Sequence, residues 1–135
     1  MSAHTARPHQ HTLRIVLRLP IEVEASRSQS GSFVIREPGA AGTAIARLLT
    51  ISGARNIIAF DSKGSINSAT VTKDPMRQWF IDNCNPNDFV GHLSKGIVGA
   101  DVFIGVSAGN IMTEPDVASM AKDSIVFAMA NPDPE

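Results

Sequence analysis

Short apolar segments alternate with segments of helical periodicity from residue 33 onward, and this alternation restricts the fold more than any other feature of the chain. Such an order is typical of parallel strands joined by crossover helices, with strands buried on both faces. The sequence therefore predicts an α/β protein. We expect strands at Phe33–Ile35, Ile57–Phe60, Val102–Val106 and Ile125–Met129.

Capping residues indicate where the helices begin and end. Apolar positions over residues 41–49 share one helical face, and Gly53 is placed to end that helix. Asp74 followed by Pro75 predicts the start of a second helix, which should stop before Pro86.

Two further helices are expected in the second half of the chain. One should run from residue 87 or 88 to Gly99. The other should begin at Thr113, whose hydroxyl could form a capping box with Asp116, and should turn Val117 and Met120 toward the core.

Composition excludes several classes of function. The chain has 135 residues, 43% of them hydrophobic, which suits one domain. A net charge of -1 argues against nucleic-acid and membrane partners. Cys84 is the only cysteine, and no apolar run approaches the roughly 20 residues that span a bilayer. We therefore expect a cytoplasmic protein.

The first 32 residues differ in composition from the rest. Histidine and arginine crowd the beginning, serine follows, and the continuous apolar core of a secretory signal is missing, although a transit peptide stays open. The histidines could suggest a metal site, but a solvated tail explains them better without a rigid scaffold. We expect an irregular leader over residues 1–32 and one domain over residues 33–135.

The most specific local motif is Gly39-Ala-Ala-Gly42, between an expected strand and an expected helix. Glycine lets a backbone approach a pyrophosphate, and the helix N-terminus supplies N–H donors. Asp61 lies 19 residues after Gly42, where a carboxylate can accept hydrogen bonds from an adenosine ribose. The spacing predicts a dinucleotide site in a partial Rossmann-type, doubly wound parallel sheet of about four strands.

Glu37 departs from the usual Gly-x-Gly-x-x-Gly motif, because it stands where the first glycine would be. Its carboxylate could repel a pyrophosphate, and a residue with a Cβ could be strained in the first turn. A purely structural explanation stays open, in which Gly39 and Gly42 only let the helix pack close to the strand and Asp61 is a solvated turn residue.

Four sequence blocks resemble, in order, the nucleotide domain of bacterial-type malic enzymes. They are GAAGTAIARLL (39–49), NIIAFDSKG (56–64), KGIVGADVFIGVSA (95–108) and IVFAMANPDPE (125–135). Ordered blocks over about residues 33–135 are more specific than the glycines alone. The resemblance implies oxidative decarboxylation of malate to pyruvate, with hydride transfer to NAD or NADP and a divalent Mg or Mn ion on the substrate oxygens.

The resemblance also implies roles for individual positions. Asp61 favours NAD, whereas Lys63 could approach the 2′-phosphate of NADP, so the preference leans modestly to NAD. Asn131 would contact nicotinamide or malate, unless it is only a turn residue before proline. The implied cofactor-binding residues are Gly39, Ala40, Ala41 and Gly42 at the phosphates, Asp61 at the ribose, Ser107 and Ala108 in the cleft, and Asn131, which also binds substrate.

Much of the family pattern has no counterpart in this sequence. The resemblance places the catalytic tyrosine and lysine, a substrate arginine and the acidic metal ligands before the glycine-rich loop, yet residues 1–32 match none of these motifs and the chain has no tyrosine. We therefore expect no catalytic residue and no metal ligand here, a chain truncated at both ends, and no activity from the chain alone.

Other functions stay open beside this interpretation. Ser107 lies in a Gly-x-Ser-x-Gly motif typical of serine hydrolases, but no histidine follows His92, which disfavours that chemistry. The chain could instead be a non-catalytic nucleotide-binding or interaction module, or one half of a split enzyme completed by a second chain. Uncovered apolar surface and a free sheet edge would favour a homo-oligomer or aggregation.

Overall fold

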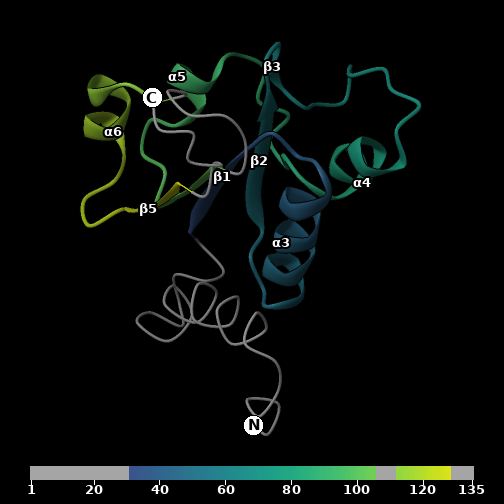
Figure 1. Ribbon diagram of the computed structural model, residues 1–135, viewed down its shortest axis with the longest axis horizontal. Helices are drawn as coiled ribbons and strands as arrows, with labels where there is room; N and C mark the ends of the chain where they lie inside the picture. Colours follow the sequence, from purple (N-terminus) through teal and green to yellow (C-terminus); the bar gives the residue numbers. More distant parts are fainter. Residues whose placement is uncertain (1–30, 106–111, 129–135) are drawn as a thin grey trace, which may run out of the picture.

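Five strands form one sheet in the order β3-β2-β1-β4-β5 in the computed structural model, which describes residues 31–105 and 112–128 (Figure 1). Four strands are parallel, whereas β3 pairs antiparallel with β2. The elements in chain order are β1 (Ser32–Arg36), α3 (Ala40–Ile51), β2 (Asn56–Asp61), β3 (Gly64–Ser65), α4 (Pro75–Asn83), α5 (Leu93–Gly96), β4 (Val102–Gly105), α6 (Glu114–Ser119) and β5 (Ile125–Ala128).

The predicted fold class and its four parallel strands are confirmed. β3 was not expected, because a strand of two residues leaves no hydrophobic pattern in the sequence. The expected final strand residues Val106 and Met129 lie outside the described residues, as do residues 1–30 of the leader expected over residues 1–32. Within the described segments, no helix combines the length and hydrophobicity that crossing a membrane requires.

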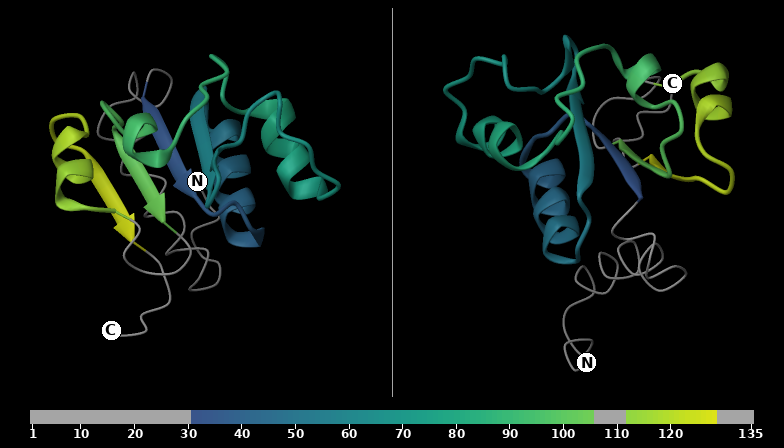
Figure 2. Two further views of the ribbon diagram at one scale, coloured as in Figure 1. Left: turned by 90° about the horizontal axis from the view of Figure 1, so that it is seen from above. Right: turned by 180° about the vertical axis from the view of Figure 1, so that it is seen from behind.

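Helices cover both faces of the sheet, so the sheet is doubly wound (Figure 2). Phe33 and Ile35 of β1 belong to a first core cluster, which contains residues of α3 and Phe80 of α4. Val34, between them, belongs to a second cluster with Phe103 of β4 and Met120, the C-cap of α6. Neighbouring residues of a strand point to opposite faces, so the two clusters hold helices on opposite sides of β1.

The predicted caps of three helices are confirmed. Gly53 follows the end of α3 with a left-handed backbone at φ 103°. Asp74 accepts a hydrogen bond from the backbone N–H of Met76 at 2.9 Å, and Pro75 is the first residue of α4. Thr113 and Asp116 form the expected reciprocal capping box of α6.

The helix expected between residue 87 or 88 and Gly99 is wrong in extent, because only α5 forms there. Asn85 and Asp88 have φ angles of 55° and 51°, which reverse the chain direction instead of starting a helix. The Asn85 side chain fixes this turn: its Oδ1 accepts from the Phe89 N–H at 2.7 Å, and its Nδ2 donates to the Ile66 and Phe89 carbonyls at 3.0 and 2.9 Å.

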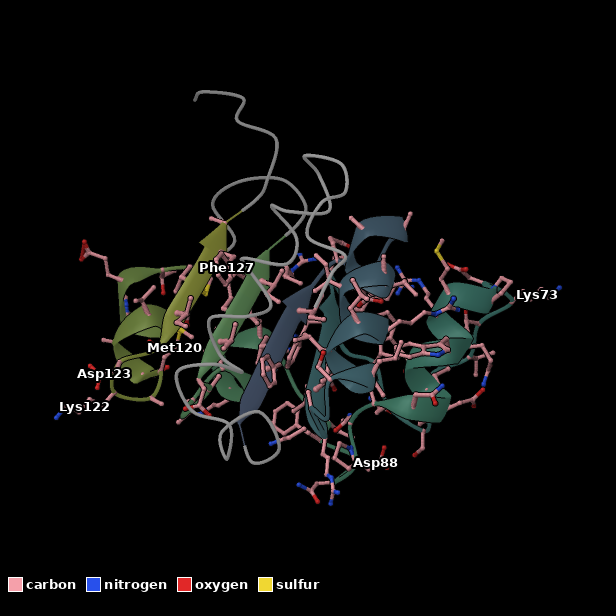
Figure 3. The ribbon with its side chains drawn as sticks, turned by 90° about the horizontal axis from the view of Figure 1, so that it is seen from below. Lys73, Asp88, Met120, Lys122, Asp123 and Phe127 are labelled. Atoms are coloured by element: carbon pink, nitrogen blue, oxygen red, sulfur yellow. The ribbon has the colours of Figure 1, made fainter. Side chains whose placement is uncertain are left out.

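Two expectations of burial are also wrong. Val117 is 44% exposed instead of facing the core, although Met120 is buried as predicted, on the β5 side of the molecule (Figure 3). The strands were expected to be buried on both faces, but β5 alternates between half-buried and exposed residues, and Val126 is 40% exposed. Within the described residues β5 has β4 as its one strand neighbour, so it lies at the sheet edge.

Candidate functional site

The carboxyl ends of β1, β2 and β4 lie at one edge of the sheet, because these strands are parallel. The chain leaves β1 toward β2 on one side, and β4 pairs with β1 on the other side. Ligands of open α/β sheets bind at such a switch in strand order, outside the carboxyl ends. Glu37 follows β1 at this edge, and Asp61 ends β2.

The turn after β1 is tied to the end of β2. The backbone N–H of Glu37 donates to the Phe60 carbonyl at 2.7 Å, directly before Asp61. The Gly39 N–H donates to the Glu37 carbonyl at 2.8 Å, and Thr43 donates to the Gly39 carbonyl through its N–H at 2.9 Å and its hydroxyl at 2.7 Å. These bonds hold the N-terminus of α3 beside Asp61.

Gly39 is the N-cap of α3 and faces open space. Its φ of -87° suits any residue, and a Cβ built on it would meet no described atom within 4 Å. No side chain caps the helix at this residue. Packing therefore does not explain the glycine at this position, whereas buried Gly42 remains compatible with close packing. The open space lies at a helix N-terminus, where oriented N–H groups favour an anion.

Glu37 takes the backbone conformation that glycine usually supplies. Its φ is 67°, in the left-handed region, which costs a residue with a Cβ about 1 kcal/mol. The Glu37 carboxylate accepts a hydrogen bond from Arg36 Nη1 at 2.8 Å, and both side chains are half-buried. Arg36 therefore offsets part of the negative charge that the carboxylate brings to the loop.

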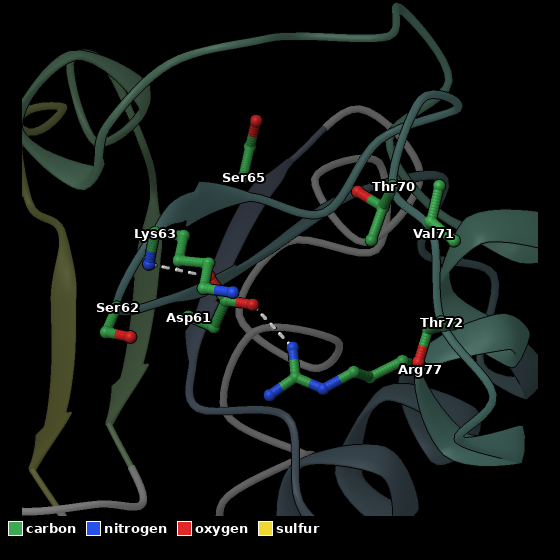
Figure 4. Close-up of a pocket in the computed structure, with 8 residues that line it drawn as sticks. All are labelled: Asp61, Ser62, Lys63, Ser65, Thr70, Val71, Thr72 and Arg77. Atoms are coloured by element: carbon green, nitrogen blue, oxygen red, sulfur yellow. Dashed lines mark hydrogen bonds and ion pairs between the residues drawn. The ribbon is translucent and has the colours of Figure 1, made fainter.

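Asp61 lines a cavity of about 520 Å³ at the carboxyl end of β2 (Figure 4). Its Oδ1 accepts from the Lys63 N–H at 2.8 Å, and its Oδ2 accepts from Arg77 Nη1 at 2.5 Å. Arg77 lies in the first turns of α4, and sequence analysis missed it because nothing in the spacing links it to Asp61. The cavity is lined by Asp61, Ser62, Lys63, Ser65, Thr70, Val71, Thr72 and Arg77.

The remaining predicted positions divide into two groups. Ala40 and Ala41 are exposed residues at the start of α3, next to Gly39 and at the same sheet edge as Asp61. Ser107, Ala108 and Asn131 lie outside the described residues. In the part of the chain that the structure describes, no group of three or more His, Cys, Asp or Glu side chains could hold a metal ion.

Sequence relatives of this chain are malic enzymes. No protein-family model matches it. The chain is 50% identical over 97 residues to an NAD-dependent malic enzyme of Geobacillus stearothermophilus, an alignment that covers 72% of this chain and 20% of the relative. It is 41% identical over 120 residues to a bifunctional malic/malolactic enzyme of Bacillus subtilis strain 168, covering 85% of this chain and 28% of the relative.

Solved structures of malic enzymes share the fold. The malic enzyme of Entamoeba histolytica superposes with a TM-score of 0.76 at 28% identity, covering 91% of this chain and 27% of that one. The NAD-dependent malic enzyme of Thermotoga maritima gives 0.75 at 25% identity, covering 90% and 34%. This chain thus spans about a third or less of each of these four proteins. It is a homologue of the malic enzymes, matched along one part of their length.

Proposed function

We propose that this chain is the dinucleotide-binding portion of a malic enzyme and holds NAD or NADP at the carboxyl edge of its sheet. The observation that carries the proposal is the open space at Gly39, because a glycine that neither backbone conformation nor packing requires is explained by the approach of a ligand. One relative is named as an NAD-dependent malic enzyme and another as an NADP-dependent malic enzyme, which supports this choice of ligand.

Each part of the edge has a role in the proposal. In a complete malic enzyme the dinucleotide would supply the acceptor for the hydride that leaves malate. The pyrophosphate would lie on Gly39 and the first N–H groups of α3, where Ala40 and Ala41 offer no bulky side chain. The adenosine ribose would lie by Asp61, which the loop bonds place near Gly39. The family resemblance assigns Ser107 and Ala108 to the cofactor cleft and Asn131 to nicotinamide or malate.

Oxidation of malate needs more than this edge. It requires a proton acceptor and a metal that polarises the substrate, and the proposal assigns neither to a residue of this chain. We therefore expect dinucleotide binding without malate turnover from the purified chain. We propose the conversion of malate to pyruvate only for a complete malic enzyme that contains this dinucleotide-binding portion.

The Gly39→Ala variant tests the proposal against the packing explanation. The added methyl group faces open space, so the free energy of unfolding should change by about 1 kcal/mol or less. The same methyl group would enter the pyrophosphate position, so affinity for NAD and NADP should fall by about tenfold or more. Calorimetric titration measures the affinity, and urea unfolding measures the stability.

Ser52→Ala is the matched control, because Ser52 lies at the opposite end of α3. This variant should bind as the unaltered chain does. Equal binding by the Gly39→Ala variant would show that the open space does not receive the dinucleotide, and the proposal would then be wrong for this loop.

Two variants at Glu37 separate charge from backbone strain. Glu37→Gln removes the carboxylate but keeps a Cβ at positive φ, whereas Glu37→Gly removes both. If the carboxylate opposes the pyrophosphate, both variants should bind more tightly than the unaltered chain in the same titration. If only the backbone matters, Glu37→Gly alone should gain affinity. Failure of all three chains to bind would refute the proposed function.

A further inference from the structure

The cavity beside Asp61 contains more donors than a ribose needs. Its lining includes two cationic side chains, Lys63 and Arg77, and the hydroxyl groups of Ser62, Thr70 and Thr72, with Asp61 as the one acidic residue (Figure 4). The Ser65 hydroxyl also lines the cavity but already donates to the Phe89 carbonyl at 2.8 Å. Lys63 and Ser62 are exposed at the turn between β2 and β3, and Arg77 reaches in from α4. This collection of donors suits an anion better than a neutral sugar.

The Asp61 carboxylate is already engaged by this chain. Its two oxygens accept from the Lys63 N–H and from Arg77 Nη1. A ribose that lacks a phosphate would rely on the same carboxylate for its hydroxyl groups and would compete with a charge-assisted hydrogen bond. The Arg77 pair thus weakens the sequence argument that Asp61 alone favours NAD.

Arg77 has N–H donors that make no hydrogen bond to a described residue. A guanidinium carries five N–H donors, and the described residues show one hydrogen bond from it, the bond from Nη1 to Asp61. Its Nε lies 3.9 Å from an Asp74 oxygen, beyond hydrogen-bond distance. Asp74 itself accepts from the N–H of Met76. Arg77 can therefore keep its bond to Asp61 and still donate to a phosphate.

We infer that Arg77 is a specificity-determining residue that makes this cavity a site for the 2′-phosphate of NADP. The inference rests on the proposed function and adds to it the choice of dinucleotide. Arg77 offsets the charge of Asp61, so a 2′-phosphate meets less repulsion, and the guanidinium supplies paired donors of the kind that phosphates accept. Lys63 adds a second positive charge at the mouth of the cavity.

The test compares two probes that differ only at the 2′ position, adenosine 2′,5′-bisphosphate and 5′-AMP. Each is titrated calorimetrically into the full 135-residue chain and into its variants. The unaltered chain should bind the bisphosphate about tenfold more tightly or better, since a hydrogen bond to a charged group has that magnitude. Arg77→Gln should bring the two affinities close together, because 5′-AMP binding should hold or improve once Asp61 is released.

Three further variants sharpen the result. Arg77→Lys keeps the charge without the planar fork and should retain part of the preference. Asp61→Asn leaves the guanidinium without its carboxylate and should raise the preference. Arg55→Gln makes the same charge change at an exposed residue before the amino end of β2, and the ratio of the two affinities should not move.

The outcomes separate this inference from the proposed function. The inference would be overturned, while dinucleotide binding stands, if the unaltered chain preferred 5′-AMP. It would also be overturned if the unaltered chain, Arg77→Gln and Arg77→Lys all preferred the bisphosphate over 5′-AMP by the same factor. Loss of affinity for both probes in equal proportion would mean that Arg77 only supports the fold, and would also overturn it. Failure of both probes to bind while NAD or NADP still binds would overturn this inference alone, and failure of the dinucleotides to bind the unaltered chain and Glu37→Gly would overturn both proposals.

Discussion

Cys84 is the C-cap of α4 and packs against the first core cluster, where burial raises the pKa of its thiol from 9.0 to about 12. An acid whose pKa is raised by folding stabilises the folded state while it is neutral in both states. This contribution is complete below pH 9 and is lost as the pH rises from 9 toward 12, because the unfolded chain then releases the proton first.

The free energy of unfolding should therefore fall by about 1 kcal/mol between pH 9 and pH 10 through this thiol alone. Urea unfolding of the chain and of Cys84→Ala at pH 7.5, 9 and 10 measures it. The variant should lose less stability over the interval, whatever its stability at pH 7.5. Parallel losses in both chains would mean that the thiol is not protected from ionisation.

Sequence analysis proposed Asp61 and Gly39 as site residues but could not predict which side chains surround them. The spacing of a glycine-rich loop and a later acidic residue can be read along the chain, because both follow strands. The pairing of Asp61 with Arg77, and of Glu37 with Arg36, depends on side-chain directions that only the packed elements define. All of the predicted cofactor-binding residues stay predictions, and Ser107, Ala108 and Asn131 also lie outside the described residues.

The contact between α5 and β2 depends on a glycine. A Cβ built on Gly96 would lie 2.1 Å from Cζ of Phe60, and the Phe60 ring is fully buried in the second core cluster. Gly96→Ala should destabilise the chain by about 1–3 kcal/mol, because the ring cannot move without disturbing its neighbours. Urea unfolding measures the change.

Gly39→Ala is the matched control for this element. It adds the same methyl group where no described atom lies within 4 Å, so it should lower the free energy of unfolding by no more than about 1 kcal/mol, less than Gly96→Ala does. Equal midpoints for the two variants would contradict the packing of α5 on Phe60.

Helix prediction succeeded where capping chemistry is local and failed where it is not. Asp74, Pro75, Thr113 and Asp116 act within one turn of the helices that they begin, so the sequence alone places α4 and α6. The segment before α5 is instead fixed by Asn85, whose amide donates to the carbonyl of Ile66, 19 residues away. Periodicity contains no sign of such a bond.

The sheet as a whole has an apolar edge among the described residues. β5 pairs with β4 on one side, and Val126 is exposed on it. Edge strands of this kind associate with other chains, so the chain should form larger species as its concentration rises. Light scattering after size exclusion at several concentrations measures the mass.

Val126→Lys should shift the chain toward monomer, because a charge at an edge opposes strand pairing. Val98→Lys makes the same substitution at another exposed valine, outside β5, and should leave the association unchanged. A mass that stays that of one chain at every concentration would contradict association through this edge.

The position of β1 in the sheet bears on how this chain folds as it is synthesised. β1 is the central strand of the sheet, and its two neighbours lie at different distances along the chain. β2 follows soon after β1, whereas β4 is synthesised much later, since Val34 of β1 pairs with Phe103 of β4. A ribosome adds about 5–20 residues per second, so one flank of β1 waits some seconds for the strand that covers it. During that interval the nascent chain exposes a β1 edge available to chaperones and to wrong partners.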